Sequence, residues 1–169
     1  MYELNVRARV WKFPENVNTD QIIPNRAYYL SPEEQLPFIF DAMRPGWVDE
    51  MKNGDIIIAK RNFGMGSSRP AARNLALLGV GCLVADNING LFYRNSVNFG
   101  LPAMECGGVS DMFEEGQIAD VSFQDFMIRN VDTGESLQGR EVPKSLLRIL
   151  NAGGLYPLLE DEGMIALAE

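Results

Sequence analysis

The sequence predicts a single α/β domain, a mixed sheet with flanking helices, over residues 1–169. Two short apolar runs, residues 56–59 and 82–85, have the composition of strands buried on both faces. A strongly helical run, residues 71–78, separates them, and this strand–helix–strand order is typical of parallel α/β units. The chain has 169 residues, 46% of them apolar, and shows neither an internal repeat nor a linker. This matches one domain with a substantial core.

The N-terminal part is expected to supply one strand, a loop and a short helix. Apolar and polar residues alternate over residues 4–10, as in a half-buried strand. Residues 14–20 are polar and predict a loop, and the Ile-Ile-Pro at residues 22–24 predicts a brief extended segment. The Ser-Pro-Glu-Glu at residues 31–34 then predicts a helix start, because Ser is a favoured N-cap, Pro suits the first position and acids suit the first turn. Pro37 is expected to limit or bend this helix.

The remaining elements follow the second apolar run. Residues 91–99 predict a helix and residues 101–104 a short strand. Two further strands, residues 118–123 and 126–131, are joined by a tight turn. A last helix is expected over residues 143–150, before a pair of glycines. The chain therefore combines a parallel α/β part with an additional β layer.

Charge and hydropathy restrict the classes of partner. Lys and Arg number 15 and Asp and Glu 23, so the formal net charge is −8 and the pI is near 4.6. This balance is a poor electrostatic match for nucleic acid or for an anionic membrane surface. The first residues have no apolar core of a signal peptide, and no apolar run approaches the roughly 20 residues of a membrane span. We therefore expect a cytoplasmic protein that binds neither nucleic acid nor membranes.

The sequence contains no histidine, which excludes Ser-His-Asp and Cys-His mechanisms and imidazole metal ligands within this chain. Its two cysteines, Cys82 and Cys106, form no C-x-x-C pair. We interpret them as buried, reduced side chains, and expect no metal or iron–sulfur site held by this chain alone. A catalytic base must therefore be a different side chain of this sequence or come from a partner.

Residues 64–69, Gly-Met-Gly-Ser-Ser-Arg, form a candidate anion-binding loop between a buried strand and a helix. Glycines allow a close backbone approach, and the helix start presents unpaired N–H groups. Ser67 and Ser68 add hydroxyls, and Arg69 adds a planar fork for a carboxylate or phosphate. The loop matches neither the dinucleotide fingerprint nor the P-loop. The alternative is a purely structural turn whose serines cap the helix, and Arg69 favours the anion site because a cap does not need a guanidinium.

Four segments in the same order resemble the swivel domain of the aconitase superfamily, in particular the small subunits of the 3-isopropylmalate dehydratase family. The resemblance extends over roughly residues 6–158. The matching segments are N-T-D-Q-I-I-P at residues 18–24, G-D-I-I-I-A with N-F-G-M-G-S-S-R at residues 54–69, L-F-Y-R-N-S-V-N-F-G-L-P at residues 91–102 and N-A-G-G-L at residues 151–155.

This resemblance implies an aconitase-type swivelling β/β/α domain that is active only with a large subunit. The large subunit is expected to carry a [4Fe–4S] cluster, and this chain to bind no cofactor. The implied reaction is dehydration and rehydration of a small 2-hydroxy acid, with isomerisation of 2- to 3-isopropylmalate in leucine biosynthesis as the first hypothesis. Ser67 would be the general base, with Asp20 orienting active-site groups, and Ser68 and Arg69 would bind a substrate carboxylate. From the residues alone, Asp20 would be interpreted as an Asx-turn residue.

The loop after Pro24 is the segment with which the family selects the substrate side chain. Arg26 and the side chains of Tyr28, Tyr29 and Leu30 are therefore candidate substrate-binding residues. The alternative for the three apolar residues is that they pack under the loop.

The sequence departs from the family pattern directly after Arg69, where Pro70-Ala71 replaces the usual Glu-His. Two alternatives to the first hypothesis therefore stay open. One is the small subunit of a sister hydro-lyase, such as homoaconitase or dimethylmalate dehydratase, and the other is an anion-binding module of the same fold without a partner.

Overall fold

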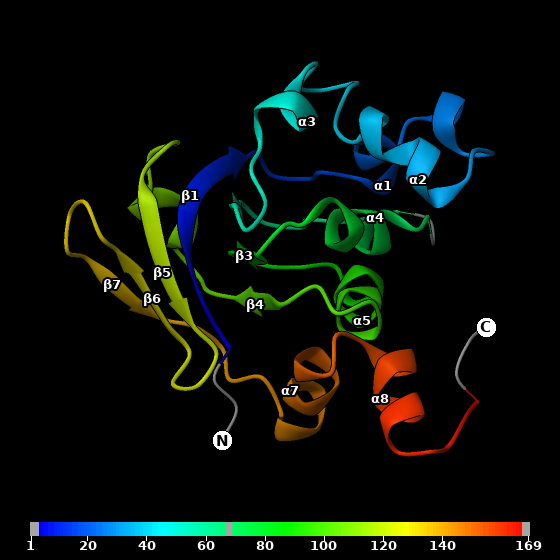
Figure 1. The fold of residues 1–169 in the computed structure, drawn as a ribbon. Coiled ribbons are helices and arrows are strands. Elements are labelled where there is room, and N and C mark those ends of the chain that lie inside the picture. Colours follow the sequence, from blue (N-terminus) through cyan, green and yellow to red (C-terminus); the bar gives the residue numbers. More distant parts are fainter. Residues whose placement is uncertain (1–3, 67–68, 167–169) are drawn as a thin grey trace.

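A computed structural model describes residues 4–66 and 69–166 (Figure 1). In this part of the chain, seven strands form one mixed sheet with the order β4-β3-β2-β1-β5-β6-β7. The strands are β1 (Asn5–Phe13), β2 (Ile56–Ala59), β3 (Cys82–Ala85), β4 (Ala103–Glu105), β5 (Ile118–Ser122), β6 (Met127–Asn130) and β7 (Ser136–Gln138).

Strand β1 joins a parallel half of the sheet to an antiparallel half. Its first part, from Asn5 to Arg9, pairs antiparallel with β5, and its second part, from Val10 to Phe13, pairs parallel with β2. Strands β2, β3 and β4 continue the parallel half, whereas β5, β6 and β7 form an antiparallel meander. In Figure 1 the long, curved β1 lies between the two halves. This confirms the expected mixed sheet with an additional β layer.

Helices cover both faces of the parallel half. They are α1 (Thr19–Ile22), α2 (Pro32–Gln35), α3 (Trp47–Glu50), α4 (Ala71–Leu78), α5 (Gly90–Asn98), α6 (Val109–Met112), α7 (Lys144–Asn151) and α8 (Leu155–Asp161), with 3-10 turns η1 (Asn25–Ala27) and η2 (Leu36–Phe38). Figure 1 shows α1 to α5 on one side of the parallel strands, with α7 and α8 against α5. None of the helices in the described ranges combines the length and the hydrophobicity that crossing a bilayer would need.

Two apolar clusters fill the space on the two faces of the sheet. Ile57 and Leu83 pack with aromatic rings on the side of α4, whereas Ile56, Ile58 and Val84 pack toward α6 and the antiparallel strands. Every side chain of β2 and β3 is buried, as the apolar runs predict. Cys82 and Cys106 are buried and free, and burial raises the pKa of both thiols, which keeps them protonated.

The structure corrects three of the expected elements. Ile22 ends helix α1 instead of forming an extended segment, because Asn18 and Gln21 close a capping box on this turn. A seventh strand, β7, follows the predicted hairpin, and α7 is not the last helix, because α8 begins directly after Gly154.

A buried carboxylate fastens the start of β2 to β1. Asp55, 5% exposed, accepts hydrogen bonds from the Trp11 indole at 2.8 Å, from Arg9 Nη2 at 2.7 Å and from the Lys52 backbone at 2.9 Å. Burial acts to raise the pKa of Asp55, but the hydrogen bonds from Lys52, Arg9 and Trp11 and the charge of Arg9 outweigh it and lower this pKa. Asp55 therefore stabilises the folded state as a carboxylate.

We expect Asp55→Asn to lower the free energy of unfolding by about 2–3 kcal/mol at pH 7, because three donors lose a charged acceptor. The folded-state pKa is lowered, so this stabilisation is complete above the unfolded-state pKa of about 3.9 and disappears as the pH falls through the folded-state value. Urea unfolding of the wild type and of Asp55→Asn between pH 7 and pH 3 measures this difference in the free energy of unfolding. The exposed Asp161→Asn should change stability by less than about 0.5 kcal/mol. If Asp55→Asn lowered the free energy of unfolding by the same amount at every pH, the charge of Asp55 would not be the source of the stabilisation.

Candidate active site

The candidate site is built where two chain segments leave the ends of β1 and β2 and continue side by side. The Gly64 and Met65 N–H groups donate to the Val17 carbonyl at 2.7 and 3.2 Å. The Thr19 N–H in turn donates to the Met65 carbonyl at 2.9 Å. These bonds hold the glycine loop against the segment that carries Asp20.

A third segment supports the glycine loop from the other side. Phe63 donates from its N–H to the Asn87 carbonyl at 3.2 Å and accepts from the Asn89 N–H at 2.8 Å. This segment leads from β3 to the start of α5, where the Asn89 side chain caps Leu91. The glycine loop is thus the middle of three hydrogen-bonded segments that follow the carboxyl ends of parallel strands, the usual place for ligand sites in such sheets.

Gly64 is required by both its backbone angle and its surroundings. Its φ is +78°, and a Cβ at this position would lie 2.2 Å from Cγ of Phe92. Phe92 is buried and packs edge-on against Phe63, with ring centroids 5.3 Å apart. The ring is therefore not free to move away, and the loop can pass this close to α5 only without a side chain.

Arg69 lies at the end of the loop with its guanidinium almost fully covered, its side chain being 11% exposed. Nη1 donates to the Ile23 carbonyl at 2.9 Å, and Nη2 donates to Oδ1 of Asn25. Nε lies 2.6 Å from Oδ1 of Asp20, an ion pair in which the N–H does not align as a hydrogen bond. The guanidinium carbon lies 5.0 Å from the ring centroid of Tyr28. Every nitrogen of Arg69 therefore has a contact with the segment at residues 20–28.

Of the two predicted catalytic residues, Asp20 and Ser67, the structure describes Asp20. Asp20 is in the first turn of α1, 58% exposed, and forms an ion pair with Arg69. Ser67 and Ser68 lie outside the described residues. Asp20 and Arg69, which are far apart in the sequence, thus lie side by side in the structure.

The loop after Pro24, which we call the selectivity loop after its proposed role, contributes one aromatic ring to this cluster, and a second ring packs against the first. Tyr28 covers Arg69 and is 46% exposed, whereas Tyr29 is 93% exposed and contacts Tyr28 edge-on. Leu30 is 37% exposed. None of these three side chains is buried, so they do not pack under the loop.

Arg26 contacts Asp41 and Phe38, and not the cluster around Arg69, in the described structure. It forms an ion pair with Asp41, and its guanidinium lies over the ring of Phe38 at 5.1 Å. The carboxylate of Asp41, which follows η2, therefore compensates the charge of Arg26. The contacts of Asn25 and of the Ile23 carbonyl with Arg69 were not anticipated, because nothing in the local sequence distinguishes them.

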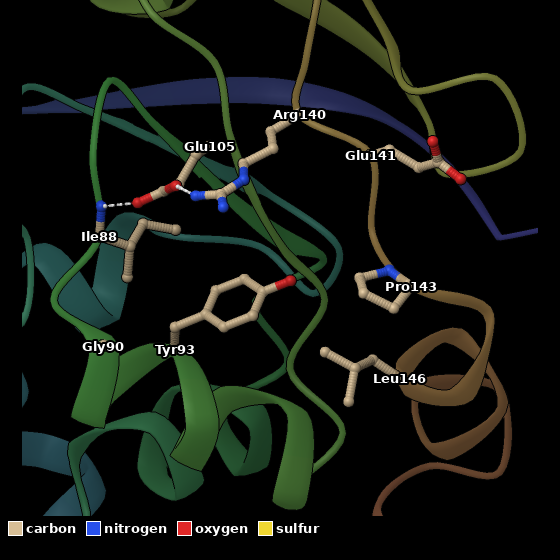
Figure 2. Close-up of a pocket in the computed structure, with 8 residues that line it drawn as sticks. All are labelled: Ile88, Gly90, Tyr93, Glu105, Arg140, Glu141, Pro143 and Leu146. Atoms are coloured by element: carbon tan, nitrogen blue, oxygen red, sulfur yellow. Dashed lines mark hydrogen bonds and ion pairs between the residues drawn. The ribbon is translucent and has the colours of Figure 1, made fainter.

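A separate cavity of about 420 Å³ lies behind the third segment (Figure 2). In it, Glu105 accepts hydrogen bonds from the Ile88 N–H and from Arg140, both at 2.9 Å, and so ties this segment to β4. Figure 2 shows the Tyr93 hydroxyl between Arg140 and Leu146. Burial, and then the charge of Glu105, raise the pKa of Tyr93. The cavity contains neither Asp20 nor Arg69, and we regard its polar groups as support for the site.

The described residues contain no group of three or more Cys, Asp or Glu side chains that would hold a metal ion. Cys82 lies inside β3, and Cys106 follows β4 and contacts the Gln138 carbonyl. Neither thiol belongs to the cluster around Arg69. The arrangement offers instead a cation, a carboxylate and exposed backbone, which together suit a carboxylate-bearing ligand.

Comparisons with known proteins agree with this fold. The Aconitase C-terminal domain family matches residues 11–106. The chain is 42% identical to a 3-isopropylmalate dehydratase small subunit of Methanopyrus kandleri, covering 94% of each chain, and 42% identical to the isopropylmalate/citramalate isomerase small subunit of Methanocaldococcus jannaschii, covering 92% of this chain and 94% of that one. A crystal structure of a 3-isopropylmalate dehydratase protein from Methanocaldococcus jannaschii superposes with a TM-score of 0.88 at 27% identity, over 95% of this chain and 96% of the other.

We expect Gly64→Ala to destabilise the protein by about 2 kcal/mol more than Gly134→Ala. Both glycines have φ near +80°, but a Cβ at Gly134 meets no atom within 4 Å. Gly134→Ala is therefore the control, because it is destabilised only by the strain of a side chain at positive φ. The measurement is thermal or urea unfolding of the two variants. Equal destabilisation would show that the approach of Phe92 does not constrain the loop.

Proposed function

This chain belongs to the 3-isopropylmalate dehydratase small-subunit family of the aconitase superfamily, and we propose that it forms an active hydro-lyase together with a large subunit. The proposed reaction is the isomerisation of 2-isopropylmalate to 3-isopropylmalate by dehydration and rehydration. The observation that best supports it is the covered Arg69 guanidinium, held by Asp20 at the end of the glycine loop.

The partner is proposed to supply the iron–sulfur cluster. The sequence has no histidine, and the two cysteines are buried away from the Arg69 cluster, so this chain does not offer a ligand set of its own. A [4Fe–4S] cluster with an open iron would act as a Lewis acid on the substrate hydroxyl. The remaining steps concern residues of this chain.

Arg69 is proposed to bind a substrate carboxylate. Its three nitrogens contact Asp20, the Ile23 carbonyl and Asn25, and Nη1 and Nη2 each carry a second N–H, so a ligand can bind these groups or replace the neutral Asn25 acceptor. A carboxylate is a stronger acceptor for guanidinium than a neutral amide. We therefore expect the substrate to displace Asn25, while Asp20 and Ile23 keep the guanidinium in place.

Ser67 is proposed as the base that removes a proton from carbon, and Ser68 as a second donor to the carboxylate. A serine alkoxide forms only where N–H groups and cations stabilise it. In the sequence this serine follows the two glycines of the loop directly, and α4 starts at Ala71. Asp20 is proposed to fix the orientation of Arg69 and not to react itself.

The selectivity loop favours an alkyl-substituted malate over a substrate with an additional carboxylate. Arg26, the cation of this loop, is already neutralised by Asp41 and covers Phe38. Tyr28 presents an aromatic ring beside the carboxylate-binding guanidinium. Isopropylmalate and methyl-substituted malates are therefore the first candidates, and homocitrate-type substrates the second.

The proposal is tested by co-expression with a large subunit, co-purification and turnover assays on isopropylmalate, methyl-substituted malates and homocitrate-type acids. We expect a complex that is active on an alkyl malate, and Ser67→Ala to reduce its kcat by at least about a hundredfold without loss of assembly. The exposed Ser136→Ala on β7 is the control and should keep full activity. Near-normal turnover of Ser67→Ala would remove Ser67 from the role of base. A chain that binds carboxylates but neither assembles nor turns over substrate would instead be an anion-binding module.

We expect Arg69→Lys to raise KM about tenfold or more, because one ammonium cannot keep three contacts and also offer a fork to the substrate. Arg73→Lys in α4 serves as the matched control, since the Arg73 side chain donates to the Oδ1 of its neighbour Asn74 and not to the segment that carries Asp20 in the described structure. The measurement is steady-state kinetics of the reconstituted complex. Unchanged KM and kcat in Arg69→Lys would contradict the proposed role in substrate binding.

A further inference from the structure

Two asparagines occupy equivalent places on the two segments that form the site. Asn16 lies three positions after the end of β1, and Asn62 lies three positions after the end of β2. Both adopt the left-handed backbone conformation, with φ of 59° and 61°. Asparagine is one of the few side-chain-bearing residues that adopt this conformation readily.

Their side chains bond to each other across the two segments. Asn62 Nδ2 donates to Asn16 Oδ1 at 3.0 Å and lies 3.3 Å from the sulfur of Met65. The Asn16 N–H donates to the Arg61 carbonyl at 3.0 Å. The asparagine pair is thus connected both to the opposite backbone and to the glycine loop itself.

This pair stands at the base of a ladder that leads to the site. Beyond it, Gly64 and Met65 bond to Val17, and Thr19 bonds to Met65. The ladder ends at the ion pair of Asp20 with Arg69. A change in the turn at Asn16 and Asn62 therefore shifts every later contact between the two segments.

We propose that the Asn16–Asn62 amide pair is a positioning element for the active site, which it affects by fixing the register of the glycine loop against the Asp20 segment. This inference rests on the proposed function. Neither asparagine is assigned a contact with substrate, and both act through the loop. Misplacement of catalytic groups by a fraction of an ångström to one ångström lowers turnover strongly, so the pair is expected to influence kcat more than KM.

The test separates the amide from the backbone conformation. We expect Asn62→Ala and Asn62→Gly each to lower kcat of the reconstituted complex about tenfold, with KM changed less than about threefold. Glycine retains the left-handed backbone without the amide. Asn16→Ala should lower kcat by a similar factor. Asn16→Asp should retain most of the wild-type kcat, because its carboxylate is still an acceptor for Asn62 Nδ2. The double variant Asn16→Ala/Asn62→Ala should have a kcat no lower than that of either single variant, because both substitutions remove the same hydrogen bond.

A second readout does not depend on activity. In the isolated chain, amide hydrogen exchange of Thr19, Gly64 and Met65 should accelerate in Asn62→Gly, since these N–H groups form the ladder beyond the pair. Thr133→Ala removes a comparable exposed side-chain bond, to Glu135 in the β6–β7 turn, and should alter neither this exchange nor kcat.

Two results would overturn the inference. One is wild-type kcat in Asn62→Gly, which would leave only a backbone requirement. The other is unchanged exchange at the three amides. Absence of turnover in the wild-type complex would contradict the proposed function instead, and the exchange experiment would still decide whether the pair sets the register of the loop.

Discussion

The parallel register between β1 and β2 is the constraint on which the site depends. Val10 pairs with Ile56 and Phe13 with Ala59, so partners on the two strands are 46 positions apart. The same separation recurs in the side-chain contacts of Arg9 with Asp55, of Asn16 with Asn62 and of Arg69 with the Ile23 carbonyl. Beyond the strands the backbone alignment moves by one residue, since Asn18 bridges to Met65. The alignment set by β1 and β2 is thus continued, with this offset, into the segments that carry the site. The burial of β2 on both faces does not by itself select this alignment, because apolar side chains occupy both faces. The hydrogen bonds of Arg9 and Trp11 to Asp55 are contacts that only this register permits.

The sequence predicts the parts of this arrangement that are local, but not those that depend on the register. The apolar runs identify β2 and β3, and glycine with serine and arginine identifies the loop, because such patterns follow from backbone geometry and helix capping. The contacts of Arg69 with Asn25 and of Asn62 with Asn16 join residues 44 and 46 positions apart. No pattern within either segment specifies them. Short elements were also missed, since α1 depends on one capping box and β7 on pairing with β6.

Each of the two arginines near the site pairs with one carboxylate, and burial is what distinguishes them. Arg69 is covered and contacts one carboxylate and two neutral acceptors, so it retains a contact that an anionic ligand can replace. Arg26 is exposed and paired with Asp41. An exposed cation with its own counterion gains little from a further anion, because water and Asp41 already screen it. The resemblance alone treats both residues as substrate contacts, and the structure provides a physical reason to rank Arg69 first.

The exposure of the site is a physical argument that the proposed chemistry involves a partner. Asp20 is 58% exposed and Tyr29 is 93% exposed, so water reaches the region beside Arg69 in this chain. Hydrogen bonds and charges stabilise a developing alkoxide or carbanion effectively only where water is excluded and donors are fixed in advance. The ladder between the two segments fixes the donors but covers only one side. A large subunit that supplies the Lewis acid would also cover the open side, so assembly and activation of Ser67 would be the same event.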